Sequence, residues 1–273
     1  MSESLYRILL EGASFEVIPL KGISEKTRLI DPGPTISVTA SPSRGTDATV
    51  DLALELQEQG HRAVPHISAR MIEDRRELDR VIRRLDHGGV TQVFITGGDG
   101  EPQGDYFDAH SLLRDMADLG HPFDEVGITG YPEGHPVITD AALRQAMLDK
   151  QPFATHIVTQ MCFDPESIVT WVGDLRGDGV ELPIKVGVPG AVDPARLLAI
   201  SARIGVGDSV RFLAKNRRAV LRILRPGRYR PDRLLKPLAL MGAGLGLTGT
   251  HFFTFNQVAP TVAYHRRSLD RLS

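Results

Sequence analysis

The sequence predicts a single (β/α)8 barrel spanning residues 1–273, and three observations favour this fold. Short β-branched runs alternate with longer runs of helical periodicity, successive strands starting about 22 to 34 residues apart through the seventh, and such alternation implies a parallel sheet. There are eight of these strand-like runs, the number that closes a barrel. Seven of them end in a polar or turn-forming residue. Since all strand ends of a barrel open on one face, where catalytic residues lie, the pattern predicts an enzyme and places its site.

The predicted strands can be taken in order along the chain. They lie near 12–18, 35–39, 62–67, 91–96, 124–130, 154–160, 182–187 and 249–254. Apolar residues at helical spacing predict helices over 72–85 and 165–175. The segment between the first two strands, KGISEKTRLIDPGP, has Gly22 near its start and Pro32-Gly33-Pro34 at its end. The first helix should therefore be very short or absent, whereas the long segment before the last strand has room for helices near 193–204, 207–225 and 231–246.

An open, doubly wound sheet is the alternative fold. The turn Gly97-Gly98-Asp99-Gly100 would then be a dinucleotide loop, but it is not GxGxxG and no helix begins directly after it. Eight regularly alternating strands favour the closed barrel.

Composition excludes several classes of protein. The formal net charge of −2 gives no bulk attraction to nucleic acid, and the single cysteine, Cys162, excludes an internal disulfide and a cysteine-based zinc site. The first twelve residues are too polar for a signal peptide, and no apolar run approaches the roughly 18 residues that span a bilayer. We therefore expect a cytoplasmic protein with no membrane or nucleic-acid partner.

Two carboxylic acids at strand ends are candidates for chemistry. Glu16 lies between apolar residues, and desolvation there would raise its pKa towards that of a general acid; a hydrogen-bonded structural role is the alternative. Asp99 lies in a glycine-rich turn that a ligand could approach closely, although a turn aspartate bonding its own backbone would give the same pattern.

Other polar strand-end residues are candidates for binding. His66 and His135 lack the HxH or HExxH spacing of a metal site, so we expect no metal. Tyr131 and His135 share a loop and could contact a ligand. Gln160 ends a strand, where its amide offers a donor and an acceptor to a heterocycle.

A basic stretch runs from Arg211 to Lys236, with ten basic residues and one acid. A solvated helical face is one interpretation, and a site for the anionic tail of a substrate or a cofactor phosphate is the other.

Together the strand ends resemble the methylenetetrahydrofolate reductase family. The resemblance rests on SFE, SVT, PH and G-D on the first four strands, GYPEGHP after the fifth, VTQ with Phe163-Asp164 after the sixth, PI-x-x-G-x-P on the seventh and HFFTFN on the eighth. It covers nearly the whole chain and implies the barrel already predicted.

The resemblance implies a reaction, the reduction of 5,10-methylenetetrahydrofolate to 5-methyltetrahydrofolate by NAD(P)H. Glu16 matches the general acid that protonates N10, and Asp99 matches the aspartate that stabilises the cationic iminium. The implied folate contacts are Gln160, Phe163, Asn256 and Gln257. The implied cofactor contacts are Thr39, His66, Gly97, Gly98, Tyr131 and His135.

The chain departs from the family where flavin is usually held. Gly97 replaces an arginine, Asp149 aligns with a lysine, and Phe153 replaces a glycine; Ala40-Ser41 replaces Tyr-Gly and Gln257 an arginine. The loss of two cations removes partners for a pyrophosphate. We therefore expect direct transfer from NADH with little or no FAD bound. A non-catalytic folate- or nucleotide-binding protein, or a reductase of another pterin carrier, is the alternative.

Overall fold

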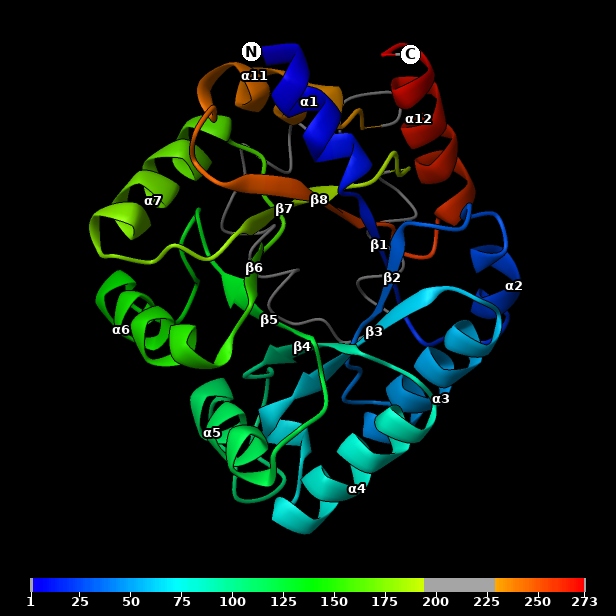
Figure 1. Cartoon of the computed structure of the whole chain (residues 1–273), viewed down its shortest axis with the longest axis vertical. Coiled ribbons are helices and arrows are strands. Elements are labelled where there is room, and N and C mark those ends of the chain that lie inside the picture. Colours follow the sequence, from blue (N-terminus) through cyan, green and yellow to red (C-terminus); the bar gives the residue numbers. More distant parts are fainter. Residues whose placement is uncertain (1, 194–228, 273) are drawn as a thin grey trace.

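The computed structural model describes residues 2–193 and 229–272, and its centre is a closed parallel barrel (Figure 1). The eight strands pair in sequence order, and β1 also pairs with β8, where Ser14 lies opposite His251. This pairing excludes the open sheet. The strands are β1 (Ser14–Val17), β2 (Thr35–Val38), β3 (Arg62–Ser68), β4 (Gln92–Thr96), β5 (Glu125–Gly130), β6 (His156–Thr159), β7 (Ile184–Pro189) and β8 (Leu247–Phe253).

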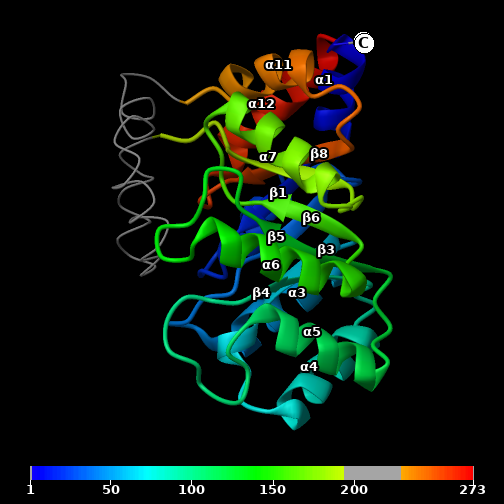
Figure 2. The ribbon, with the colours of Figure 1, turned by 90° about the vertical axis from the view of Figure 1, so that its left-hand side faces the viewer.

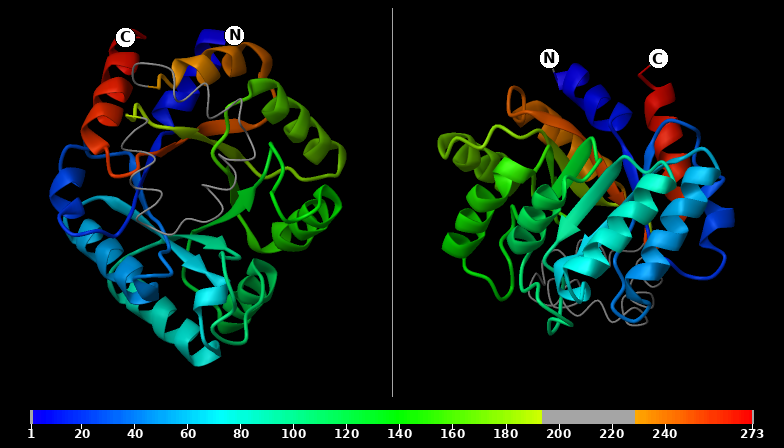
Figure 3. Two further views of the ribbon diagram at one scale, coloured as in Figure 1. Left: turned by 180° about the vertical axis from the view of Figure 1, so that it is seen from behind. Right: turned by 60° about the horizontal axis from the view of Figure 1, so that its bottom comes forward.

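Helices form a ring around this barrel (Figures 1 and 3). They are α1 (Ser2–Glu11), α2 (Ile23–Thr27), α3 (Gly45–Glu58), α4 (Arg75–His87), α5 (Ala109–Leu119), α6 (Asp140–Lys150), α7 (Pro165–Gly177), α11 (Asp232–Met241) and α12 (Val258–Asp270), with short 3₁₀ turns η1 (Ala69–Met71) and η2 (Gln151–Phe153). Helix α2 has 5 residues, so the prediction of a very short first helix is confirmed. Among the described helices, none is long and apolar enough to cross a membrane.

The structure differs from the sequence-based expectations at both ends of the chain. Helix α1 was not predicted; its Leu5, Leu9 and Leu10 are buried, and it packs against β8 and α11. The helix predicted over 231–246 ends at Met241, because Gly244 and Gly246 take positive φ angles of 80° and 74° in the turn before β8. The helices predicted near 193–204 and 207–225, and most of the basic stretch, fall outside the described residues.

Alternation along the strands separates the apolar core from the site. Phe15 on β1 faces the surrounding helices and is 1 % exposed, whereas its neighbours Ser14 and Glu16 face the barrel interior with His66 and His251. Within the barrel lies a small apolar cluster of Val64, Phe94 and Val158. The side view in Figure 2 shows the strands of the barrel with helices around them.

Candidate active site

Glu16 lies near the end of β1 and is the acid the sequence predicted. Its side chain is 12 % exposed. Burial raises the pKa of this carboxyl to about 7, and the nearby His66 opposes the shift. A carboxyl that titrates near neutrality can hold a proton and release it to a substrate, as a general acid must.

His251 on β8 contacts this acid directly. Its Nε2 lies 3.2 Å from Glu16 Oε2, and its Nδ1 lies 2.9 Å from the hydroxyl of Ser14. Burial lowers the pKa of His251 to about 3, so the ring is neutral at physiological pH. If the Ser14 hydroxyl donates to Nδ1, the ring proton sits on Nε2 and is donated to Glu16. Sequence reasoning assigned no role to Ser14 or His251. Ser14 could have been found, because it lies two residues before Glu16 on the same strand and so shares its face.

His66 on β3 completes a compact cluster. Burial lowers its pKa to about 4, and its ring centroid lies 4.6 Å from that of Phe94. Its Nε2 is buried without a hydrogen-bond partner among the described residues. One ligand atom from each of Glu16, His66 and His251 lies within 4.8 Å of the others. Two histidines and a carboxylate are a ligand set that zinc accepts, so the expected absence of a metal stays an expectation.

Asn256 and Gln257 were predicted to bind substrate. In the structure the side chain of each forms hydrogen bonds with backbone groups of another loop. The Asn256 amide accepts from the N–H of Ile18 at 2.8 Å and donates to the Ile18 carbonyl at 3.0 Å, with its own φ at 57°. The side-chain Oε1 of Gln257 accepts from the N–H of Asp193 at 3.0 Å. The Asn256 contacts fasten the loop after β8 to the end of β1, and the Gln257 contact joins it to the segment after β7.

The other predicted residues surround the barrel mouth. The side-chain Oε1 of Gln160 accepts from the N–H of Met161 at 2.9 Å. The hydroxyl of Thr39 donates to the Val17 carbonyl at 3.3 Å. His135 Nδ1 accepts from the N–H groups of Val137 and Ile138, which places its proton on Nε2.

The turn after β4 contains three predicted residues, Gly97, Gly98 and Asp99. A Cβ on Gly98 would lie 2.0 Å from Ser68 Oγ, so this glycine, with φ of 92°, is required. A Cβ on Gly97 would come no closer than 4.0 Å to Ala109 N. The backbone at Gly97 would therefore admit the family's arginine.

Phe163 lies in the loop between β6 and α7. Its ring centroid is 6.2 Å from that of Tyr229. Its N–H and that of Asp164 both donate to Glu133 Oε1, at 2.5 and 2.8 Å. Glu133 of the GYPEGHP motif thus joins the loop after β5 to the loop after β6.

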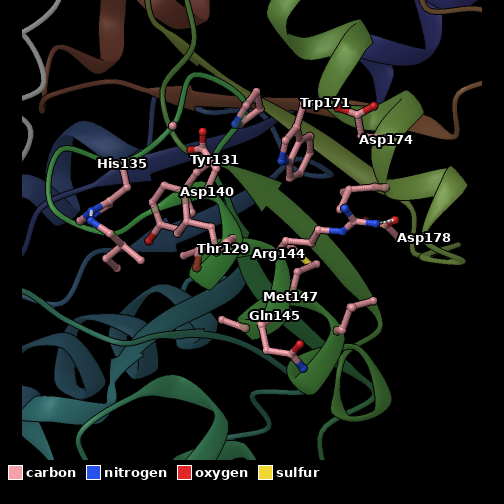
Figure 4. Close-up of a pocket in the computed structure, with 18 of the residues that line it drawn as sticks. Thr129, Tyr131, His135, Asp140, Arg144, Gln145, Met147, Trp171, Asp174 and Asp178 are labelled. Atoms are coloured by element: carbon pink, nitrogen blue, oxygen red, sulfur yellow. Dashed lines mark hydrogen bonds and ion pairs between the residues drawn. The ribbon is translucent and has the colours of Figure 1, made fainter.

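A cavity of about 1720 Å³ begins beside the barrel mouth (Figure 4). It runs from Gly97 and the N-terminus of α5, past Tyr131 and His135, to Trp171 on α7. Glu16 and Gln160 do not line it. The cavity is therefore distinct from the surroundings of Glu16.

A lysine follows directly after Asp149, the residue that aligns with the family's lysine. Asp149 accepts a hydrogen bond from Gln145 at 2.8 Å, and Lys150 is 6 % exposed; both residues line the cavity. Lys150 makes no hydrogen bond or ion pair within the described part of the chain. Burial lowers its pKa to about 8, opposed by Asp108. A cation is thus present one position later, because α6 ends at Lys150 and η2 follows at once.

Fold and site together define a (β/α)8 barrel with a buried carboxyl of raised pKa near the end of β1 and a separate cavity of about 1720 Å³ at β4, β5, α6 and α7. The chain matches the family model for methylenetetrahydrofolate reductase over residues 21–192. It therefore belongs to the methylenetetrahydrofolate reductase family.

Relatives agree with this assignment. The chain is 28% identical over 152 residues to methylenetetrahydrofolate reductase 1 of Schizosaccharomyces pombe, and 25% identical over 153 residues to methylenetetrahydrofolate reductase 2 of Saccharomyces cerevisiae. Each match covers 52% of this chain but 23% and 24% of the respective relative, so the aligned part spans about a quarter of the yeast proteins.

A solved structure shows the same fold. It is an uncharacterized protein from Clostridium thermocellum that binds two copies of 5-methyl-5,6,7,8-tetrahydrofolic acid, with a TM-score of 0.66 over 93% of each chain. At 11% identity this likeness speaks for the architecture alone.

Proposed function

We propose that the protein reduces 5,10-methylenetetrahydrofolate to 5-methyltetrahydrofolate. The observation that carries this proposal is Glu16, a buried carboxyl with a pKa of about 7 that contacts a neutral His251. Family membership and the folate bound by the structural neighbour support the substrate class.

The proposed chemistry has two steps. Glu16 gives its proton to N10 of the folate, the bond between N10 and the bridging carbon breaks, and a cationic iminium forms at N5. A hydride then adds to that carbon to give the methyl group, and the donor is oxidised to NAD⁺. In this scheme Asp99 stabilises the iminium charge, and Gln160 and Phe163 hold the pterin. His251, fixed by Ser14, orients the carboxyl.

We further propose that the hydride comes directly from a nicotinamide dinucleotide, NADH in preference to NADPH. Family members commonly use FAD as a relay, and its site in this chain has lost the arginine at Gly97 and gained the ring of Phe153, which contacts His110 at 5.8 Å between centroids. Lys150 retains one cation for a diphosphate. These residues fit flavin poorly, and the iminium is itself a sufficient hydride acceptor.

Two measurements test this function. Purified protein should oxidise NADH only when methylenetetrahydrofolate is present, and Glu16→Gln should slow the reaction by ~10²-fold or more, the usual contribution of a general acid. Lack of NADH oxidation would favour the non-catalytic folate-binding alternative. Turnover with other pterin carriers but not with methylenetetrahydrofolate would favour a different reductase.

Visible absorbance tests the direct transfer. The purified protein should be colourless. A yellow preparation with stoichiometric flavin, whose removal abolishes activity, would instead establish the flavin relay.

A further inference from the structure

The helix ring is open between α6 and α7. Helix α5 packs against α6, whereas α6 and α7 make few contacts with each other. Met147 and Lys150 are the buried residues of α6. The cavity extends into this gap, and its volume of about 1720 Å³ exceeds the roughly 300–1,000 Å³ of ordinary small-molecule pockets. A long ligand fits such a space better than a single ring does.

Trp171 presents an aromatic surface in this gap. One edge of its indole packs over Gly130, where a Cβ would lie 2.5 Å from the ring, and the side chain also lines the cavity. Thr129 and Tyr131, on either side of Gly130, line it as well (Figure 4). The absence of a side chain at Gly130 therefore lets the indole lie against the end of β5, next to the space where a ligand would enter.

Charge differs between the two ends of the cavity. At the α5 end, Lys150 is buried and unpartnered in the described structure. Asp108, which caps the N-terminus of α5, and Asp149 also line this end, so Lys150 is the group there that can bind an anion. At the α7 end, Asp174 is acidic, and the guanidinium of Arg144 forms an ion pair with Asp178 (Figure 4). Phosphates suit the first end; an uncharged group with hydroxyl and amino donors suits the second.

We propose that the cavity holds the adenosine diphosphate half of the dinucleotide, with the adenine ring stacked on Trp171 and the phosphates beside Lys150. The proposal rests on the proposed function, because it assumes a nicotinamide dinucleotide as hydride donor. Carboxylates near Trp171 accept from the ribose hydroxyls and from the adenine amino group. The nicotinamide then extends from the α5 end towards the barrel mouth.

Fluorescence provides a direct test, because Trp171 is the single tryptophan of the chain. Titration of the whole protein with 5′-AMP should quench its emission saturably, while nicotinamide mononucleotide at the same concentrations should leave it unchanged. Equal quenching by both, or none by 5′-AMP, would overturn the proposal. Quenching by 5′-AMP without NADH oxidation would leave the adenine site standing and remove the proposed reaction. NADH oxidation without quenching by 5′-AMP would support the proposed reaction and rule out the adenine site at Trp171.

Variants give a second readout. Stacking of a base on an aromatic side chain contributes about 1–3 kcal/mol, so Trp171→Leu should raise the KM for NADH roughly 10-fold with kcat unchanged, and Trp171→Phe should restore much of the loss. Lys150→Met should weaken 5′-AMP binding by about 10-fold or more, whereas its neighbour Asp149→Ala should not. An unchanged KM in Trp171→Leu, or equal effects at 149 and 150, would contradict the assignment.

Discussion

Glu16 shows how one side chain gains its chemistry from its position on a strand. It shares the inner face of β1 with Ser14, and the pairing of β1 with β8 brings His251 against both. In the folded state its pKa is about 7, above the ordinary value of 4.5. Between these two pH values the folded protein binds more protons than the unfolded chain, so stability must fall as pH rises across this window.

This reasoning predicts the effect of Glu16→Gln on stability. The glutamine side chain is uncharged at every pH, so the variant does not lose stability as the carboxyl of Glu16 ionises. The difference in free energy of unfolding, variant minus wild type, should therefore increase between pH 4.5 and 7. The gain should reach at most about 3 kcal/mol, from 1.36 kcal/mol per pKa unit. Urea unfolding at several pH values measures it. The exposed Glu58→Gln should show no such trend, and a pH-independent difference for Glu16→Gln would mean that its pKa is ordinary.

Sequence reasoning found Glu16 because a strand end between apolar residues is a local pattern. It missed His251 as a partner because that contact depends on barrel closure across 235 positions. It also did not single out Lys150, which lines the cavity together with Asp149, because the burial of a side chain in the last turn of α6 depends on how η2 continues the chain. A local sequence pattern identifies the ends of strands. Contacts between distant strands, and the face of a helix that is buried, depend on how the whole barrel assembles.

At the scale of elements, the loops above β5 and β6 act as one unit. Glu133 Oε1 accepts the N–H groups of Phe163 and Asp164, and Asp164 is the residue before α7. The carboxylate therefore lies at a helix N-terminus, where negative charge is favourable. Its position fixes Phe163 relative to the loop that contains Tyr131 and His135.

Removing this tether should loosen the substrate site without changing the acid. Glu133→Ala should raise the KM for folate by ~10-fold, with a smaller effect on kcat at saturation, because two charge-assisted hydrogen bonds are lost. Glu133→Gln should recover much of the loss, since one oxygen accepts both bonds. Glu166→Ala, in the first turn of α7, is the matched control. Steady-state kinetics decide: a loss of kcat alone would contradict a positioning role.

Elements were predictable where periodicity is strong, as in α4, whose Leu78, Val81, Ile82 and Leu85 are all buried. The segment before β8 was misjudged because glycine and leucine in Met241–Leu247 suit a packed helix by composition, while the positive φ angles that break it appear only in the folded turn. Helix α1 was missed because its polar residues obscured a short apolar stripe.

At the scale of the whole molecule, helices from both ends of the chain meet at one partly buried carboxylate, that of Asp232. The hydroxyls of Tyr6 on α1 and Tyr264 on α12 donate to Asp232 Oδ1 at 2.7 and 2.8 Å. The pKa of Asp232 is lowered: burial opposes this shift, and the two tyrosine hydrogen bonds outweigh it. Helices from the beginning and the end of the sequence are thus joined through α11.

Loss of this junction should affect stability and not catalysis, because it lies outside the mouth. Tyr264→Phe removes a hydrogen bond to a charged group, which contributes about 1.5–3 kcal/mol, and for a domain of this size should lower Tm by roughly 5 °C. Thermal unfolding and kcat/KM of the same preparation test it. A large fall in kcat/KM at a temperature where the variant is folded would show that the junction reaches the site.

The pairing of β1 with β8 also has a consequence for biosynthesis. Glu16 and His251 lie 235 positions apart in the chain, so a nascent chain carries Glu16 without its histidine partner until β8 has been translated. A fragment that ends before β8 lacks His251 and cannot form its contact with Glu16. If the proposed reaction depends on that contact, proteolytic loss of β8 should abolish activity even where the remaining strands stay folded.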